Sequence, residues 1–184
     1  MDSTPPKTGI VFYSRSGHSE QLASILSKRL NGTLVRLSAP RYDSSFFGYV
    51  RAAYDSLRQI CVLAPQSFTS LAEFDQVVIC GPVWTSYPAT PIRALLKTDG
   101  ALPQRVALLL TSGGHSPAKK AWAVAARDLE RPLAATAVLG NSLEGTDQEQ
   151  QIIDQFLDDC GFNAPQQQPA EITIGPALAE RSAV

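Results

Sequence analysis

The stretch that decides the fold covers residues 9–19 and reads Gly9-Ile10-Val11-Phe12-Tyr13-Ser14-Arg15-Ser16-Gly17-His18-Ser19. Its first five residues form a continuous apolar run, which is typical of a strand covered on both faces of a parallel sheet. After the polar turn, apolar residues recur at the spacing of one helix face, at Leu22, Ile25, Leu26 and Leu30. A buried strand, a short turn and an amphipathic helix predict the first unit of an α/β domain.

The same alternation continues along the rest of the chain. Further strands are predicted at four apolar runs: Thr33–Leu37, Gln76–Cys80, Val106–Leu110 and Thr136–Leu139. Further helices are predicted from four apolar stripes: Val50, Ala53, Tyr54 and Leu57; Ile92, Leu95 and Leu96; Trp122, Ala125, Ala126 and Leu129; and Ile153, Phe156, Leu157 and Cys160. Five strands alternating with five helices predict a doubly wound sandwich, with helices on both faces of the sheet.

Composition limits the classes of function that the chain can have. The 184 residues are 44% apolar and 18% charged, which is typical of one globular domain with a sizeable core. The formal net charge of −1 argues against a general nucleic-acid binder. The three cysteines, Cys61, Cys80 and Cys160, form no metal-binding or dithiol motif, so no metal site is expected. Cys80 is expected to be a small core residue.

The ends of the chain are expected to lie outside the folded domain. Residues 1–8 form a polar lead, residues 9–162 the domain, and residues 163–184 a tail that is expected to be extended or mobile. The lead lacks the apolar stretch of a signal peptide. No run in the chain approaches the roughly 20 apolar residues of a membrane span. A cytoplasmic location is therefore the expectation.

Three loops stand where a parallel sheet binds ligands, after the carboxyl ends of its strands. The first loop joins a strand to a helix start, and it can hold an anion on backbone N–H groups and on the hydroxyls of Ser14, Ser16 and Ser19. Gly17 allows the backbone to approach a ligand closely. The spacing is that of neither a Walker loop nor a dinucleotide fingerprint, so a monophosphate fits better. A helix cap with no ligand stays open as the alternative.

The second and third loops follow two further buried strands. The second covers Gly81 to Pro91, and its Trp84 and Tyr87 offer flat faces to a planar ring or simply roof the sheet edge. The third, Thr111-Ser112-Gly113-Gly114-His115-Ser116, can expose its backbone to a ligand or make an ordinary glycine turn. His115 is the one candidate catalytic residue, as a hydrogen-bond donor near a bound ring.

Together the three loops resemble those of the flavodoxin superfamily. Ser14-x-Ser16-Gly17-x-Ser19 is similar to its phosphate loop, Gly81-Pro82-Val83-Trp84 to the segment that packs on the flavin ring, and Thr111-Ser112-Gly113-Gly114 to the loop that borders the ring. The resemblance runs in order from about Gly9 to Cys160. It implies a three-layer α/β sandwich with a five-stranded parallel sheet in the order 2-1-3-4-5.

The resemblance also implies non-covalent FMN. The phosphate would then lie on Ser14, Arg15, Ser16, Gly17, His18 and Ser19. The ring would be lined by Pro82, Val83, Trp84, Thr85, Ser86 and Tyr87, with Trp84 as the favoured stacking residue. Its far edge would face Thr111, Ser112, Gly113, Gly114 and His115.

Three functions fit this resemblance. The leading expectation is an oxidoreductase that passes electrons from NAD(P)H through FMN to a quinone or similar acceptor. An electron carrier between protein partners is the second, although carrier flavodoxins are typically strongly acidic and this chain is nearly neutral. A non-catalytic FMN-binding interaction module is the third. In the long segment after the second strand, Phe46, Phe47 and Tyr49 can cap the core or form a patch for a second subunit, as in a homodimer. The core role is favoured.

Overall fold

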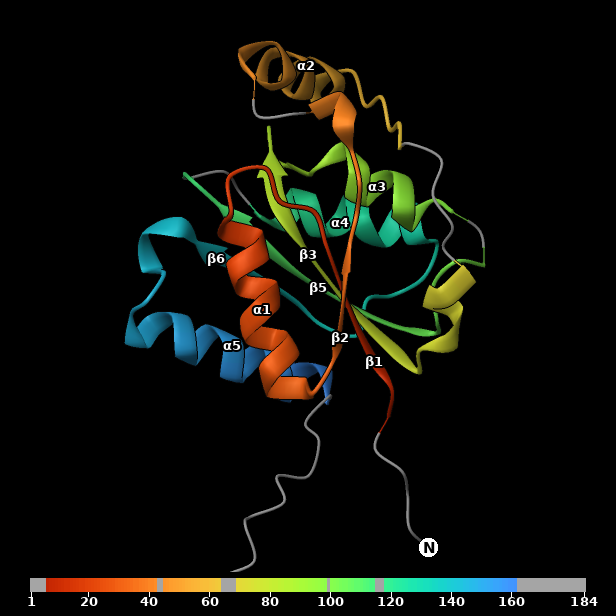
Figure 1. Cartoon of the computed structure of the whole chain (residues 1–184), viewed down its shortest axis with the longest axis vertical. Helices are drawn as coiled ribbons and strands as arrows, with labels where there is room; N and C mark the ends of the chain where they lie inside the picture. The colour runs from red at the N-terminus through yellow and green to blue at the C-terminus, as the bar shows by residue number, and fades with distance from the viewer. Residues whose placement is uncertain (1–5, 43–44, 64–68, 99, 115–117, 162–184) are drawn as a thin grey trace, which may run out of the picture.

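A single mixed sheet forms the centre of the molecule (Figure 1). The computed structural model describes residues 6–42, 45–63, 69–98, 100–114 and 118–161. Five strands run parallel in the order β2-β1-β3-β5-β6. They are β1 (Thr8–Phe12), β2 (Thr33–Arg36), β3 (Gln76–Trp84), β5 (Arg105–Ser112) and β6 (Thr136–Gly140). The expected order of the five parallel strands is confirmed, and the additional strand β4 (Tyr87–Pro88) pairs only with β3.

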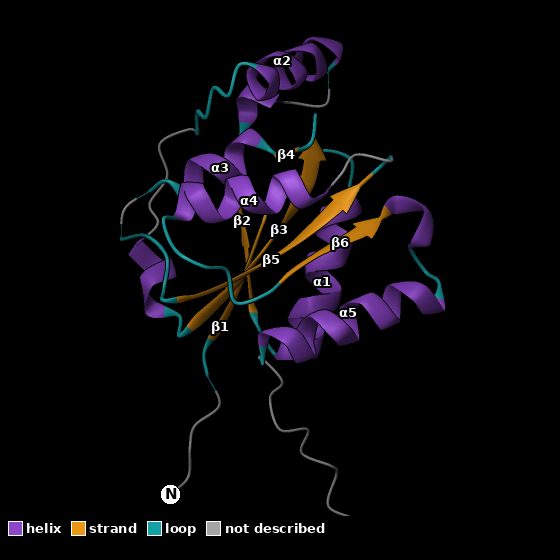
Figure 2. Cartoon of the chain, turned by 180° about the vertical axis from the view of Figure 1, so that it is seen from behind, coloured by secondary structure: helices purple, strands orange, loops and turns teal. Residues whose placement is uncertain are grey.

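Helices cover both faces of the sheet (Figures 1 and 2). α1 (His18–Leu30) and α5 (Asp147–Cys160) lie on one face, and α3 (Thr90–Leu96) and α4 (Ala118–Leu129) lie on the other. α2 (Phe46–Leu57) lies beyond the carboxyl ends of the strands, at the top of Figure 1. Short 3-10 turns lie at Pro40–Tyr42, Thr69–Glu73 and Asn141–Leu143. Each predicted helix is present. The central strands are buried on both faces and need apolar cover on each side, which α1, α3, α4 and α5 provide.

Alternate residues of the central strands feed two separate cores. Val77 and Ile79 of β3 point to the side of α3 and α4, whereas Val78 and Cys80 point to α1 and α5. This period of two is what a strand buried on both faces produces. Cys80 is fully buried, as expected, and burial raises the pKa of its thiol. The helices of the described residues include none long and apolar enough to cross a membrane.

The second predicted loop is wrong in its first half. β3 continues through Gly81 to Trp84, and the chain then folds back as a hairpin in which Trp84 pairs with Tyr87. The two turn residues, Thr85 and Ser86, have φ angles of 47° and 70°. Such a turn normally selects asparagine or glycine, and non-glycine residues in this conformation cost on the order of 1–3 kcal/mol each. The loop that should face a ligand therefore stores backbone strain.

Helix α2 corrects the prediction for the long segment after β2. Its predicted apolar stripe faces solvent, since Val50, Tyr54 and Leu57 are exposed. The expected core role of Phe46, Phe47 and Tyr49 is also wrong, because all three are exposed. The residues that α2 does bury are Gly48, Ala52, Asp55 and Ser56. Small residues let α2 approach the sheet edge closely, and a buried polar network holds it there.

Candidate cofactor site

The first loop leaves the N-terminus of α1 open. Gly17 caps the helix in a left-handed conformation, φ 97°, and no side chain caps the helix there. The first N–H groups of a helix have no acceptor within the helix, so they are available to an anion. The Ser14 hydroxyl already accepts the Gly17 N–H at 3.0 Å, which fixes the turn. A Cβ atom placed on Gly17 would meet no atom of the described residues within 4 Å, so among these residues the space above it is open.

One hydrogen bond joins the first loop to the third. The hydroxyls of Ser19 and Thr111 lie 2.7 Å apart and are buried. Ser19 belongs to α1 and Thr111 ends β5, and β3 lies between β1 and β5 in the sheet. The bond thus ties two loops across a strand. It also means that the Ser19 hydroxyl faces the sheet rather than the open space above Gly17.

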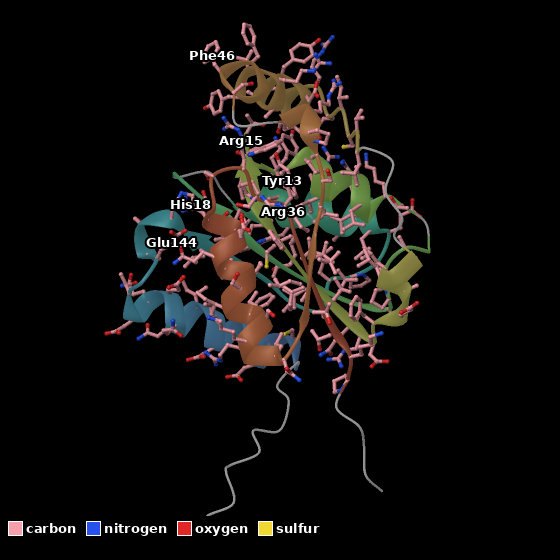
Figure 3. All side chains as sticks on the ribbon, in the orientation of Figure 1. Tyr13, Arg15, His18, Arg36, Phe46 and Glu144 are labelled. Atoms are coloured by element: carbon pink, nitrogen blue, oxygen red, sulfur yellow. The ribbon has the colours of Figure 1, made fainter. Side chains whose placement is uncertain are left out.

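His18 contacts a residue that the sequence did not single out. Its Nδ1 lies 2.7 Å from Oε1 of Glu144, which follows β6 (Figure 3). Glu144 follows the last strand at the same sheet edge as the three loops, and that position is the only sequence signal that could have found it. The His18 ring is therefore turned toward Glu144, and its backbone stays at the helix start. Arg15 lies with its guanidinium 4.9 Å from the ring of Tyr49 in α2.

The second loop approaches the first through Trp84. The half-buried indole makes edge-to-face contacts with Tyr13 and Tyr42, at centroid distances of 5.6 and 5.4 Å. Trp84 also lines a hollow of about 230 Å³ with Arg15, Thr85 and Tyr49. The neighbouring Pro82, Val83 and Ser86 are half-buried. The ring of Tyr87, in contrast, already has Lys120 Nζ 4.2 Å from its centroid.

The third loop ends β5 with buried hydroxyls and exposed glycines. Thr111 and Ser112 are buried, and the Ser112 hydroxyl donates to the Gly114 carbonyl at 2.9 Å. Gly113 and Gly114 are exposed, so their backbone is accessible. His115, the candidate catalytic residue, lies outside the described residues. In the part of the chain that is described, no group of three metal-ligating side chains occurs.

A polar network below α2 fixes the edge of the site. The Asp55 carboxylate is 1% exposed and accepts from Arg41 Nε at 2.7 Å and from the Tyr42 hydroxyl at 2.9 Å. The Tyr13 hydroxyl donates to the Tyr42 carbonyl at 3.3 Å, and burial raises the pKa of Tyr13 to about 12. Burial alone would raise the pKa of Asp55, but the hydrogen bonds from Arg41 and Tyr42 outweigh it and lower that pKa.

We expect Asp55 to make the protein more stable above the usual aspartate pKa of 3.8 than below it. A lowered folded-state pKa stabilises the ionised form, and this contribution is lost as pH falls through and below that value. Asp55→Asn should lower the free energy of unfolding at pH 7 by about 1.5–3 kcal/mol. The variant should also lose less stability than the wild type between pH 7 and pH 3. Urea unfolding at pH 7 and pH 3 measures both. Asp154→Asn, which breaks only a surface pair with Arg29, is the control. Equal behaviour of the two variants would contradict the prediction.

Comparison with solved structures identifies the fold. A flavoprotein from Lactobacillus acidophilus NCFM in complex with FMN superposes with a TM-score of 0.64 at 22% identity, covering 82% of this chain and 98% of that one. The chain has the flavodoxin-like fold. A putative flavoprotein from Bacteroides uniformis gives 0.63 at 18% identity, with 82% and 99% covered. One from Bacteroides eggerthii gives 0.59 at 15% identity, with 85% and 98% covered. Scans of the sequence against protein-family models and against curated proteins find no match.

The flavodoxin-like fold explains why the three loops meet. In this order of parallel strands, β1, β3 and β5 are neighbours, and their carboxyl ends lie at one edge of the sheet. The sequence placed the loops at strand ends. The structure adds the direct links between them, through Ser19 and Thr111 and through the hollow that Arg15 shares with Trp84.

Proposed function

We propose that this flavodoxin-like protein binds FMN non-covalently at the carboxyl edge of its sheet and uses it to transfer electrons. The observation that carries the proposal is the open N-terminus of α1, which the Ser19–Thr111 bond joins to the third loop. The L. acidophilus protein, which was solved with FMN, supports it by its fold.

The residues of the site fit the chemical parts of FMN. A phosphate suits the space above Gly17, where uncapped N–H groups and the positive end of the helix dipole favour an anion. Ser14, Ser16 and the backbone of His18 would hold it, with the Arg15 guanidinium nearby. A planar ring suits the second loop, where Trp84 lines a hollow. The exposed backbone of Gly113 and Gly114 would face the ring edge.

The protein's own contribution is to bind and shield the cofactor. FMN, when bound, supplies the one- and two-electron chemistry. Two hydroxyl contacts of Ser56, 2.9 Å to the Trp84 carbonyl oxygen and 2.7 Å to Thr85 Oγ1, hold the strained Thr85–Ser86 turn in one position. A rigid loop limits reorganisation around the ring. Electrons would come from NAD(P)H and pass to a quinone or similar acceptor, and the near-neutral net charge supports this reaction over a carrier role.

The binding test compares two glycines that both have a positive φ angle. Gly17 and Gly100 both have positive φ, 97° and 66°, and a Cβ atom on either meets nothing within 4 Å. Alanine at either position therefore carries backbone strain, on the order of 1–2 kcal/mol. We expect only Gly17→Ala to weaken FMN binding, by at least about tenfold, because its methyl group enters the space of the phosphate. Quenching of FMN fluorescence gives the dissociation constants. Equal affinity of the two variants, or no FMN binding by the wild type, would refute the proposal.

The reaction is tested separately on FMN-loaded protein. Anaerobic addition of NADH or NADPH should bleach the visible band of the bound flavin, and a quinone should then restore it. A flavin that NAD(P)H leaves oxidised, but that a flavodoxin reductase reduces quickly, would move the function to the electron carrier. If FMN binds tightly but neither NAD(P)H nor a flavodoxin reductase reduces it, the remaining function is the non-catalytic interaction module.

A further inference from the structure

The apolar and polar sides of α2 are the reverse of those of an ordinary surface helix. Its outward side, here called the α2 apolar face, consists of Phe46, Phe47, Tyr49, Val50, Tyr54 and Leu57, all exposed in the described structure. The largest values are 83% for Phe47, 74% for Phe46 and 66% for Leu57. A helix of a lone domain normally turns its apolar stripe to the core. Six large apolar side chains of one helix are thus exposed, and such contiguous patches mark interaction sites.

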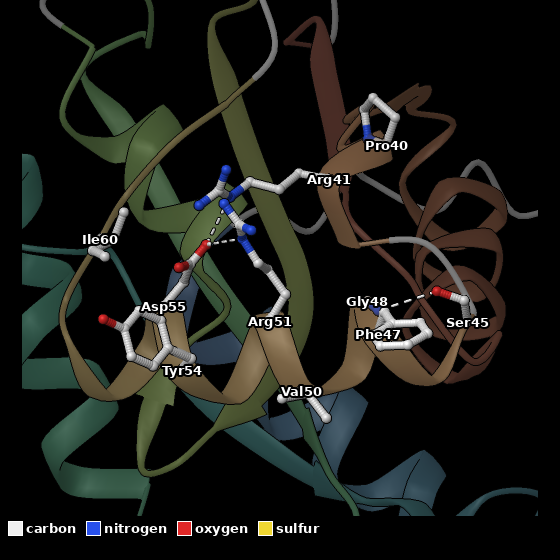
Figure 4. A pocket seen from close by; sticks show the side chains of 10 residues that line it. All are labelled: Pro40, Arg41, Ser45, Phe47, Gly48, Val50, Arg51, Tyr54, Asp55 and Ile60. Carbon is white, nitrogen blue, oxygen red and sulfur yellow. Dashed lines mark hydrogen bonds and ion pairs between the residues drawn. The ribbon is translucent and has the colours of Figure 1, made fainter.

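A groove runs along one side of this face (Figure 4). It has a volume of about 850 Å³, and Phe47, Val50 and Tyr54 form its apolar wall. Its floor is polar, since Arg41, Arg51 and Asp55 line it. The second carboxylate oxygen of Asp55, Oδ1, is buried and has no hydrogen-bond partner among the described residues. The groove therefore offers another molecule an apolar wall beside a polar floor.

We propose that the α2 apolar face docks on the same face of a second copy of this chain. Four of its side chains are aromatic, and each buries about 150–250 Å² when fully covered. At their exposures these four alone offer roughly 500 Å² per copy, and Val50 and Leu57 add to it. A stable interface takes about 800 Å² from each partner, so two such faces are of the right size. The proposal does not depend on the flavin, although Tyr49 also lines the hollow beside Trp84.

The shape and the charge of the surface favour a second copy over other occupants. A ridge, Phe46 and Leu57, lies beside the groove on one helix, so a two-fold axis can bring each ridge to the other copy's groove. Aromatic residues with arginine, without lysine or exposed acid in α2, are the composition of protein interfaces. Helix α5, after which the described residues end, lies at the opposite end of the molecule from α2 (Figure 1).

The test is the mass of the full chain in solution. Sedimentation velocity and light scattering at micromolar concentrations should give twice the 19.8 kDa of one chain. Phe47→Asp and Leu57→Asp should each give the monomer mass, because they place a charge in the interface. Both positions are exposed, so circular dichroism and the melting temperature of the monomeric fold should be preserved. Leu34→Asp is the matched control, since Leu34 is also an exposed apolar residue, 44%, but lies in β2.

Three results would overturn the proposal. One is a wild-type monomer at all concentrations up to the solubility limit. Another is a dimer that survives both aspartate substitutions together, which would place the interface elsewhere. The last is a wild-type chain that stays monomeric and binds vesicles of anionic phospholipid, with binding abolished by Phe47→Asp, which would assign the face to a membrane.

Discussion

Asp128→Ala is expected to lower the free energy of unfolding by about 3–5 kcal/mol, which is a large share of the stability of a domain. Asp128 in α4 pairs with Arg93 in α3, with 2.5 Å between Nε and Oδ2, and the two side chains are 3% and 1% exposed. Arg93 also donates to Gln59, which follows α2. Removal of the carboxylate leaves a buried guanidinium without its counter-charge. An unpaired buried charge strongly destabilises the folded state.

The two halves of this pair are not equivalent. Lys97 and Arg127 also lie near Asp128 Oδ1, at 3.8 and 3.4 Å, so Arg93→Met leaves the carboxylate with two cations. Arg93→Met should therefore cost less than Asp128→Ala. The double variant Arg93→Met/Asp128→Leu should recover much of the loss, because an apolar pair needs no desolvation. Urea unfolding of the three variants measures the difference. If Asp128→Ala were as stable as the wild type, the buried pair would not exist in solution.

Gly81→Ala is the second substitution with a large expected effect. It should lower the free energy of unfolding by about 1–3 kcal/mol. A Cβ atom on Gly81 would stand 1.8 Å from Cδ1 of Ile92, which is fully buried in α3. Overlap of this size forces α3 away from β3 or puts Ile92 into a strained rotamer. The glycine is therefore required by helix–strand packing, not by its own φ angle.

The overlap can also be relieved by shortening the side chain of Ile92. Ile92→Val removes the clashing methyl group, so Gly81→Ala/Ile92→Val should be more stable than Gly81→Ala, although Ile92→Val alone costs about 0.5–1.5 kcal/mol. Gly114→Ala is the control, because a Cβ atom there meets nothing within 4 Å. Thermal unfolding of the four variants gives the comparison. A Gly81→Ala protein as stable as the Gly114→Ala protein would show that α3 does not pack this closely.

Much of the fold was predictable because it depends on local pattern. Apolar runs and helical stripes identified the five parallel strands and the five α-helices of the described residues. The resemblance then supplied their order in the sheet. The carboxyl ends of parallel strands meet at one edge, so the three loops could be placed together before any contact was known. The fully buried Cys80 is a further residue that its strand pattern placed correctly.

What the sequence by itself determined is therefore the set of elements and the edge where their loops meet. Tertiary structure alone decided which side of α2 is covered, because periodicity shows that a helix has two sides but not what lies against each. Asp55 is buried only because Arg41 and Tyr42 reach it. The Ser19–Thr111, His18–Glu144 and Arg93–Asp128 contacts join residues far apart in the chain, and no local pattern encodes them. Long-range pairing of polar groups depends on the assembled sheet, and it sets the final geometry of the site.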